Sequence, residues 1–177
     1  MKRTYGLLAL GLIIVAIGAF ALFGAFNGGG SSSIGDRQTQ FSALLRPDQE
    51  RLAHQREIVR REAEGRYGIK ELHRSEEDIP VLQALLDDNA FLPHQTYELK
   101  SLGIVFGDIF DAAPRYSWTI VTDEHGRDAT IRYGETSLHI NAQTMISQRV
   151  ERGETVDVRL LYEETLKSFE NENSRLR

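Results

Sequence analysis

Acidic, basic and imidazole side chains gather in one short stretch, residues 123–128, which reads Asp-Glu-His-Gly-Arg-Asp. A histidine beside a carboxylate can accept and donate protons near neutral pH, so Asp123 and His125 form a candidate acid–base pair for hydrolysis. The same residue types also build ordinary hairpin turns, in which Arg127 would pair with Asp123 or Asp128. We favour this structural interpretation over contact with a partner or catalysis.

Other motifs with known chemistry are missing from the sequence. It has no G-x-S-x-G elbow, no H-E-x-x-H pair and no glycine-rich phosphate loop. His54 and Glu57 could donate two metal ligands from one helix face, but no third ligand is near, and we interpret them as surface residues. The absence of cysteine excludes disulfides and thiolate sites. We predict no catalytic residue, no metal and no cofactor.

Alternating apolar and polar residues on both sides of the 123–128 turn predict strands. One alternating segment covers residues 116–121, a second covers 129–133, and a third covers 137–141. Gly126 can take a positive φ in the first turn. We therefore predict a three-stranded antiparallel meander.

The two faces of this sheet differ in polarity. The face that must pack on helices carries Trp118, Ile120, Ile131, Leu138 and Ile140. The other face carries Ser117, Thr119, Thr130, Arg132, Ser137, His139 and Asn141. This polar face is either a plain solvated surface or a recognition surface. In the second case the binding residues are Thr119, Thr130, Arg132, His139 and Asn141, with Arg132 and His139 best able to bind a carboxylate or a backbone group.

Helical patterns occupy the rest of the chain. We predict a short helix at 36–46 that Pro47 ends, a charged helix at 48–66 and another after Ser75. The segment 94–112 is apolar around most of its circumference, which predicts the buried centre of the domain, and its Gly103 and Gly107 would let another element press against the backbone. Two C-terminal helices follow, at 143–152 and from about 155 to 170.

The first residues predict a membrane anchor. Residues 6–26 contain no charged side chain, and as a helix they would extend roughly 31 Å, enough to cross a bilayer. Lys2 and Arg3 precede this run and no basic residue follows until Arg37, which predicts a cytoplasmic N-terminus. The alternative is a cleaved secretory signal, which we favour less. Residues 27–35 would be a flexible Gly/Ser linker.

The charge balance argues against some partners. The chain has 26 acidic against 21 Lys and Arg residues and a formal net charge of −5. An acidic domain lacks the basic surface that nucleic acid or anionic lipid would require. We therefore expect no nucleic-acid partner.

Several short motifs follow one another in the second half of the chain. They comprise Leu102, Gly103, Gly107, Trp118, residues 123–128, Arg132, Tyr133, residues 145–149 and residues 151–157. In these residues and their order the chain resembles a bacterial domain family known only as a domain of unknown function. The resemblance implies an α+β fold and no known activity, so it assigns no catalytic residue.

These observations lead to one prediction of fold and function. We expect an α+β protein with a cytoplasmic segment at 1–5, a transmembrane helix at 6–26, the linker at 27–35, one domain at 36–170 and a polar tail at 171–177. We expect a single-pass protein of the bacterial inner membrane whose domain, on the outer side, binds an envelope protein or peptide without enzymatic activity. The alternatives are an envelope hydrolase that uses His125 with its neighbouring carboxylates, and a structural spacer.

Overall fold

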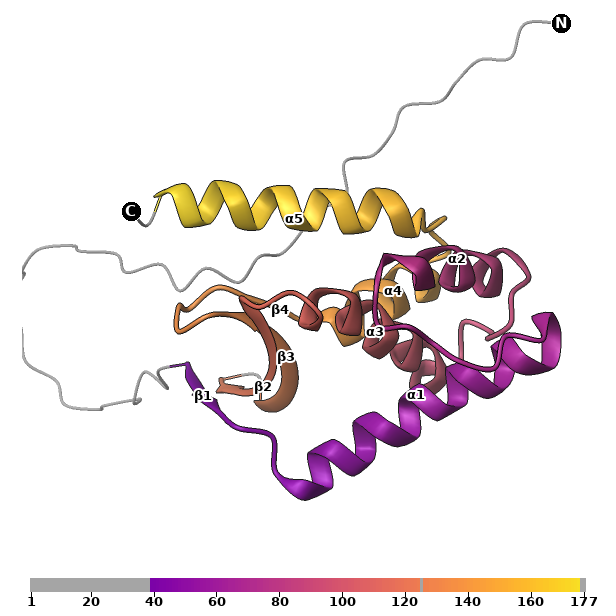
Figure 1. The fold of residues 1–177 in the computed structure, drawn as a ribbon, viewed down its shortest axis with the longest axis horizontal. Coiled ribbons are helices and arrows are strands. Elements are labelled where there is room, and N and C mark those ends of the chain that lie inside the picture. The colour runs from indigo at the N-terminus through magenta and orange to yellow at the C-terminus, as the bar shows by residue number, and fades with distance from the viewer. Residues whose placement is uncertain (1–38, 125, 176–177) are drawn as a thin grey trace, which may run out of the picture.

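A four-stranded antiparallel sheet and five α-helices make up residues 39–124 and 126–175, the part of the chain that the computed structural model describes (Figure 1). In chain order the elements are β1 (Gln40–Ser42), α1 (Arg46–Tyr67), a 3₁₀ turn η1 (Glu76–Asp78), α2 (Ile79–Asp87), α3 (Thr96–Asp111), β2 (Tyr116–Asp123), β3 (Gly126–Tyr133), β4 (His139–Ile140), α4 (Ala142–Glu151) and α5 (Val158–Arg175).

The strands lie in the sheet in chain order, β1-β2-β3-β4. β2 and β3 form the predicted hairpin, in which Asp123 pairs with Gly126, and the φ of 126° at Gly126 confirms the expected positive value. Trp118, Ile131 and Ile140 lie opposite one another in adjacent strands and share the apolar face. The sheet is strongly curved, with the helices on the outside of the curve (Figure 1).

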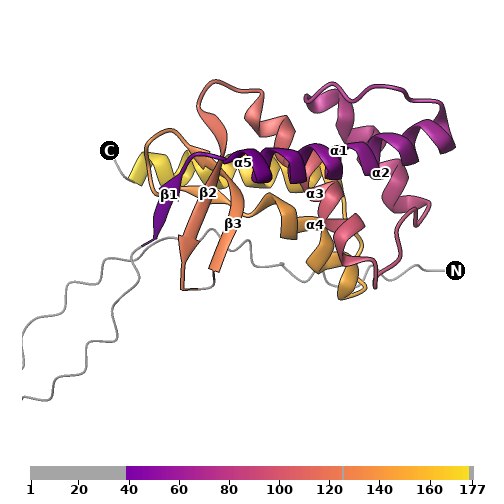
Figure 2. The same cartoon turned by 90° about the horizontal axis from the view of Figure 1, so that it is seen from below.

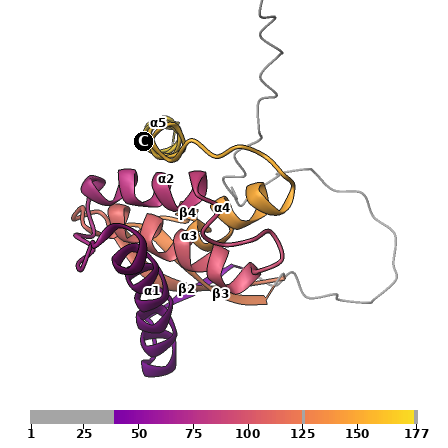
Figure 3. The ribbon, with the colours of Figure 1, turned by 90° about the vertical axis from the view of Figure 1, so that its right-hand side faces the viewer.

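Helix α3 is the centre of the molecule, as its apolar circumference predicted. Every residue from Ser101 to Phe110 is buried, and α3 lies between α1 on one side and α2 and α5 on the other (Figure 3). A Cβ at Gly103 would lie 2.5 Å from the backbone oxygen of Ala142, and one at Gly107 would lie 2.4 Å from the Trp118 ring. The two glycines therefore permit the predicted close approach, from α4 and β2.

A buried carboxylate joins α3 to α1 and β2. Asp108, 2% exposed, accepts two hydrogen bonds from the Arg56 guanidinium, at 2.6 and 2.7 Å, and one from the Trp118 Nε1 at 2.8 Å. A buried charge is tolerated when it is paired and its lone pairs are used, as they are at Asp108. The hydrogen bonds of Asp108 thus connect α3 to α1 and β2 within the core.

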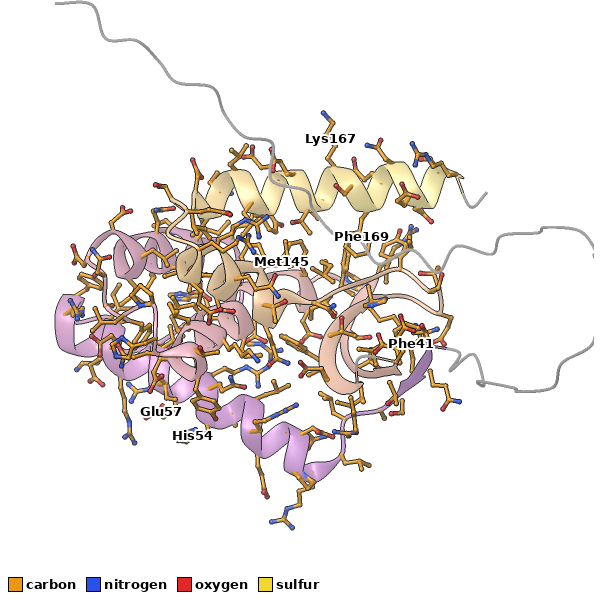
Figure 4. The ribbon with its side chains drawn as sticks, turned by 180° about the vertical axis from the view of Figure 1, so that it is seen from behind. Phe41, His54, Glu57, Met145, Lys167 and Phe169 are labelled. Carbon is orange, nitrogen blue, oxygen red and sulfur yellow. The ribbon has the colours of Figure 1, made fainter. Side chains whose placement is uncertain are left out.

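Helix α5 covers one end of the sheet with aromatic contacts. Phe169 points from α5 into the domain, whereas Lys167 points away from it (Figure 4). The Phe169 ring lies 5.5 Å from that of Tyr116 and 5.9 Å from that of Tyr133, measured between centroids. Burial raises the pKa of Tyr116 to about 12. The helix continues through residues 171–175 of the segment expected to be a polar tail.

The predicted fold class was wrong about the sheet, which has four strands where three were predicted. Residues 40–42, expected within a short helix, form strand β1 and add a fourth strand beside β2. Pro47 does not break a helix; it lies in the first turn of α1, where the missing N–H has no intrahelical partner to lose. Leu44 and Leu45, near the end of the segment predicted to be helical, lie in the connection from β1 to α1.

The predicted fold class also included a transmembrane helix at residues 6–26. These residues lie outside the part of the chain that the structure describes. Within 39–124 and 126–175, no helix combines the length and the apolar character needed to cross a membrane. The fold class is therefore corrected to α+β with five α-helices and a four-stranded antiparallel sheet in the described part of the chain.

Candidate functional site

Arg127, one of the turn residues singled out in the sequence, pairs with the start of α1. Its guanidinium donates to both carboxylate oxygens of Asp48, at 2.8 and 2.7 Å. The second Asp48 oxygen also accepts from the Leu45 backbone N–H at 3.0 Å. The Arg127 hydrogen bonds lower the pKa of Asp48 to about 2, more than burial raises it. The pair fixes the beginning of α1 to the beginning of β3.

Asp128, the last turn residue, is used in packing against α4. Its Oδ1 accepts from the backbone N–H of Ala129 and from the Gln143 side-chain amide, both at 2.9 Å. Asp123 lies at the end of β2, opposite Gly126. His125 lies outside the described residues, so the proposed acid–base pair has no described geometry.

Three residues of the sheet's polar face are buried. Thr130 is fully buried, His139 is 5% exposed and Thr119 is 9% exposed. The hydroxyl of Thr119 donates to the carbonyl of Ser42 at 2.6 Å, and that of Thr130 donates to the carbonyl of Ile140 at 2.6 Å. These threonines therefore satisfy their hydrogen-bonding needs within the sheet. Asn141 is exposed and precedes α4.

Phe41, on β1, lies across this face. Its ring centroid is 5.4 Å from that of His139, edge to face, although β1 and β4 are the two outer strands of the sheet. In a flat sheet three strand spacings of about 4.8 Å would separate them. The polar face is therefore the inside of the curve, and Phe41 lies on that side (Figure 4).

Arg132 completes the surroundings of the Phe41 ring, and we call Arg132 and His139 with the β2 edge at 120–122 the concave site. The Arg132 Cζ lies 4.2 Å from the Phe41 centroid, a cation–π distance. Arg132 donates to the backbone oxygens of Thr136 at 2.7 Å and Glu135 at 2.8 Å. The Nδ1 of His139 lies 3.0 Å from the Ser137 oxygen. Carbonyls of the β3–β4 turn thus hold both walls of the site in place.

Only residues 120–122 of the outer β2 edge can pair with another strand, and β1 pairs with them. Nearer its start the Trp118 N–H donates to Asp111 Oδ1 at 2.9 Å and the Tyr116 N–H donates to the Ala113 oxygen at 3.0 Å. The end of α3 and the residues after it therefore cover that part of the edge. Residues 120–122 are the ones that pair with β1 (Figure 2).

Sequence analysis did not single out Phe41. It fell within the helix predicted at 36–46, because one aromatic residue between Gln40 and Ser42 is too short a pattern to show period two. Proline is common in the first turn of a helix, so Pro47 could have indicated that the helix begins after Leu45.

Other candidate sites are weaker. A depression of about 440 Å³ between α2 and residues 155–159 is lined by Ile79, Pro80 and Val156 and also by Asp87, Asp157 and Arg159. These ionisable groups have partners in the fold: Asp87 accepts from Gln83, Asp157 accepts from the Leu160 N–H, and Arg159 pairs with Glu76. Two nitrogens of Arg51 and the Oε1 of Gln55 are buried without hydrogen-bond partners, but other atoms of the chain cover them. Among the described residues no three His, Asp or Glu side chains are placed to hold a metal ion. His54 lies on the exposed side of α1 and contacts the Tyr97 hydroxyl at 3.1 Å (Figure 4).

The motif residues that resemble a known family hold the fold together. Gly103 and Gly107 permit the helix contacts, Trp118 binds Asp108, and Asp157 caps α5 by accepting from the Leu160 N–H at 2.8 Å. Arg149 donates to the Met145 backbone oxygen at 2.6 Å. These contacts are structural and assign no activity to the residues that make them.

A comparison of structures supports the fold and leaves function open. A crystal structure of a protein from Bacteroides thetaiotaomicron VPI-5482 superposes with a TM-score of 0.67 at 14% sequence identity. The match covers 78% of this chain and 51% of the other, so this chain spans about half the length of that protein. At this identity the likeness shows the fold alone. No curated protein sequence matches the chain.

Part of the chain matches a known domain family. Residues 78–162 match DUF3806, a domain of unknown function. The matched residues run from the end of η1 into the first turns of α5 and include Arg132, His139 and the β2 edge, whereas β1 and α1 precede them. Residues 78–162 therefore contain a DUF3806 domain.

Proposed function

We propose that this protein is a non-enzymatic binding module whose concave site takes up an extended segment of another protein or a peptide. The segment pairs with β2 at residues 120–122 and places an aromatic side chain between Arg132 and His139. The observation that carries the proposal is the position of Phe41, whose ring lies 4.2 Å from the Arg132 Cζ on a three-residue strand at the sheet edge. A strand that adds to an open edge gains affinity from its backbone and specificity from alternate side chains.

The preformed walls of the site support this function. Arg132 is only 20% exposed and is held by two carbonyls of the β3–β4 turn, so binding does not have to order it. A group that is ordered before binding costs less conformational entropy when the partner arrives. The Arg132 guanidinium favours an aromatic ring, because the ring face is electron-rich.

A peptide-display selection on the full-length chain tests the proposal. We expect the selected peptides to share an aromatic residue within an extended stretch, and to lose at least about tenfold in affinity when Arg132 is replaced by Glu together with His139→Ala. The matched control is Lys167→Glu, a charge reversal on the side of α5 that points away from the domain. Circular dichroism melting checks that the variants are folded. Peptides that bind the double variant as well as the unchanged chain, or no selected peptides at all, would overturn the proposal.

A further inference from the structure

β1 is held to the domain by few contacts. It has three residues, of which Gln40 and Ser42 are exposed, and Phe41 is its single side chain on the concave face. Its other contacts are the backbone pairing with residues 120–122 of β2 and the Thr119 hydroxyl, which donates to the Ser42 oxygen. Elements with few buried contacts open locally with a lower free energy than the core.

The chain behind β1 is anchored independently of it. The Leu45 N–H bonds to Asp48, and Asp48 is bound by both terminal nitrogens of Arg127. α1 therefore begins at a fixed point, and residues 43–45 form the connection between this point and β1 (Figure 2). Release of β1 would break its own contacts and would leave the Asp48–Arg127 pair at the start of α1 in place.

A partner's strand and β1 would require the same place. The start of the β2 edge is covered by Asp111 and Ala113, which leaves residues 120–122 as the docking edge. The DUF3806 match includes this edge and both walls of the concave site, and Phe41 lies before it. The site and its present occupant thus belong to different parts of the chain.

We infer that β1 is a releasable self-ligand: Gln40–Ser42 occupies the concave site and competes there with an extended, aromatic-centred segment of the partner. This inference rests on the proposed function for the identity of the competitor. Occupancy of the site by β1 lowers the apparent affinity for the partner in the unchanged chain, because only the fraction of molecules with an empty site can bind. Weakening β1 increases that fraction and the apparent affinity.

NMR-detected hydrogen exchange on the full-length chain tests release without any partner. Because backbone groups alternate along an antiparallel strand, the amides of Ile120 and Thr122 face β1, and those of Thr119 and Val121 face β3. We expect the first pair to exchange faster than the second. Phe41→Ala should speed the first pair about tenfold and leave the second unchanged. Leu160→Ala, at an exposed position on α5, is the control and should change neither pair.

Fluorescence anisotropy tests competition. The probe is a labelled peptide with the sequence of residues 38–44, Gln-Thr-Gln-Phe-Ser-Ala-Leu. We expect the Phe41→Ala chain to bind it about tenfold more tightly than the unchanged chain or Leu160→Ala. The same peptide with alanine in place of phenylalanine should bind more weakly to every chain.

The outcomes separate the inference from the proposed function. Equal exchange of both amide pairs in every variant would overturn release, whatever the peptide does. Equal, measurable peptide binding by the unchanged and Phe41→Ala chains would overturn competition. Selective exchange with no peptide binding by either chain would uphold release of β1 and overturn the proposed function.

Discussion

Two aromatic side chains from opposite ends of the described chain pack against the same sheet, and they are held very differently. Phe169 is 2% exposed, belongs to an 18-residue helix and lies between two tyrosines. Phe41 is half-buried, belongs to a three-residue strand and lies against a cation and an imidazole. Phe169 is permanently packed, because its element is long and its neighbours are aromatic. Phe41 resembles a bound ligand, because its strand is short and its neighbours are polar.

Removal of the Phe169 ring should have the largest effect on stability. Phe169→Ala leaves a cavity between Tyr116 and Tyr133 and should lower the free energy of unfolding by about 3–5 kcal/mol. Urea denaturation measures it. Lys167→Ala, two residues earlier and directed away from the domain, should change it by less than about 0.5 kcal/mol. A loss below about 1 kcal/mol for Phe169→Ala would remove the contrast between the two ends.

The Asp48–Arg127 pair should contribute measurably to stability, because it fixes the start of α1 to β3. The folded-state pKa of Asp48, about 2, lies below the ordinary aspartate value of 3.8. Its carboxylate therefore stabilises the fold above about pH 4, and this contribution is lost as the pH falls through 2. Asp48→Asn should therefore cost about 1–2 kcal/mol at pH 6 and much less at pH 2. Urea denaturation at both pH values measures the difference. A cost that does not depend on pH would show that the charge of Asp48 is not what fixes α1.

Removal of the Phe41 ring should have the smallest effect on global stability. Phe41→Ala loses a half-buried ring and one cation–π contact, so we expect a loss of about 1 kcal/mol or less by urea denaturation. The variant should retain the cooperative transition of the unchanged chain. A loss as large as that of Phe169→Ala would make β1 an integral part of the core and would end the analogy with a ligand.

The core was more predictable than the site because its signals are local and repeated. The nearly continuous apolar run from Leu99 to Phe110 predicted a central helix, and Gly103 and Gly107 predicted a close contact on one of its faces. Strand alternation predicted the pairing of β2 with β3, which the register confirms.

The concave site depends on features that neither periodicity nor composition records. Residues 40–42 are too few to show alternation, so β1 was missed. Arg127 was expected to pair within its own turn, but its partner is Asp48, which is 79 positions away in sequence. The polar face was considered as solvated surface or recognition surface, whereas curvature of the sheet buries its threonines and brings Phe41 to His139. Curvature depends on how all four strands twist together.

Trp118 is the single tryptophan of the chain, and its indole N–H donates to Asp108 on the convex side of the sheet. Its emission will therefore report the contact between α3 and β2 and will follow global unfolding closely. The indole is on the opposite side of the sheet from Phe41, so departure of β1 leaves the intrinsic fluorescence unchanged. The protein thus carries an optical reporter for its core and none for the concave site, and a titration followed by tryptophan emission would be silent even when a peptide binds.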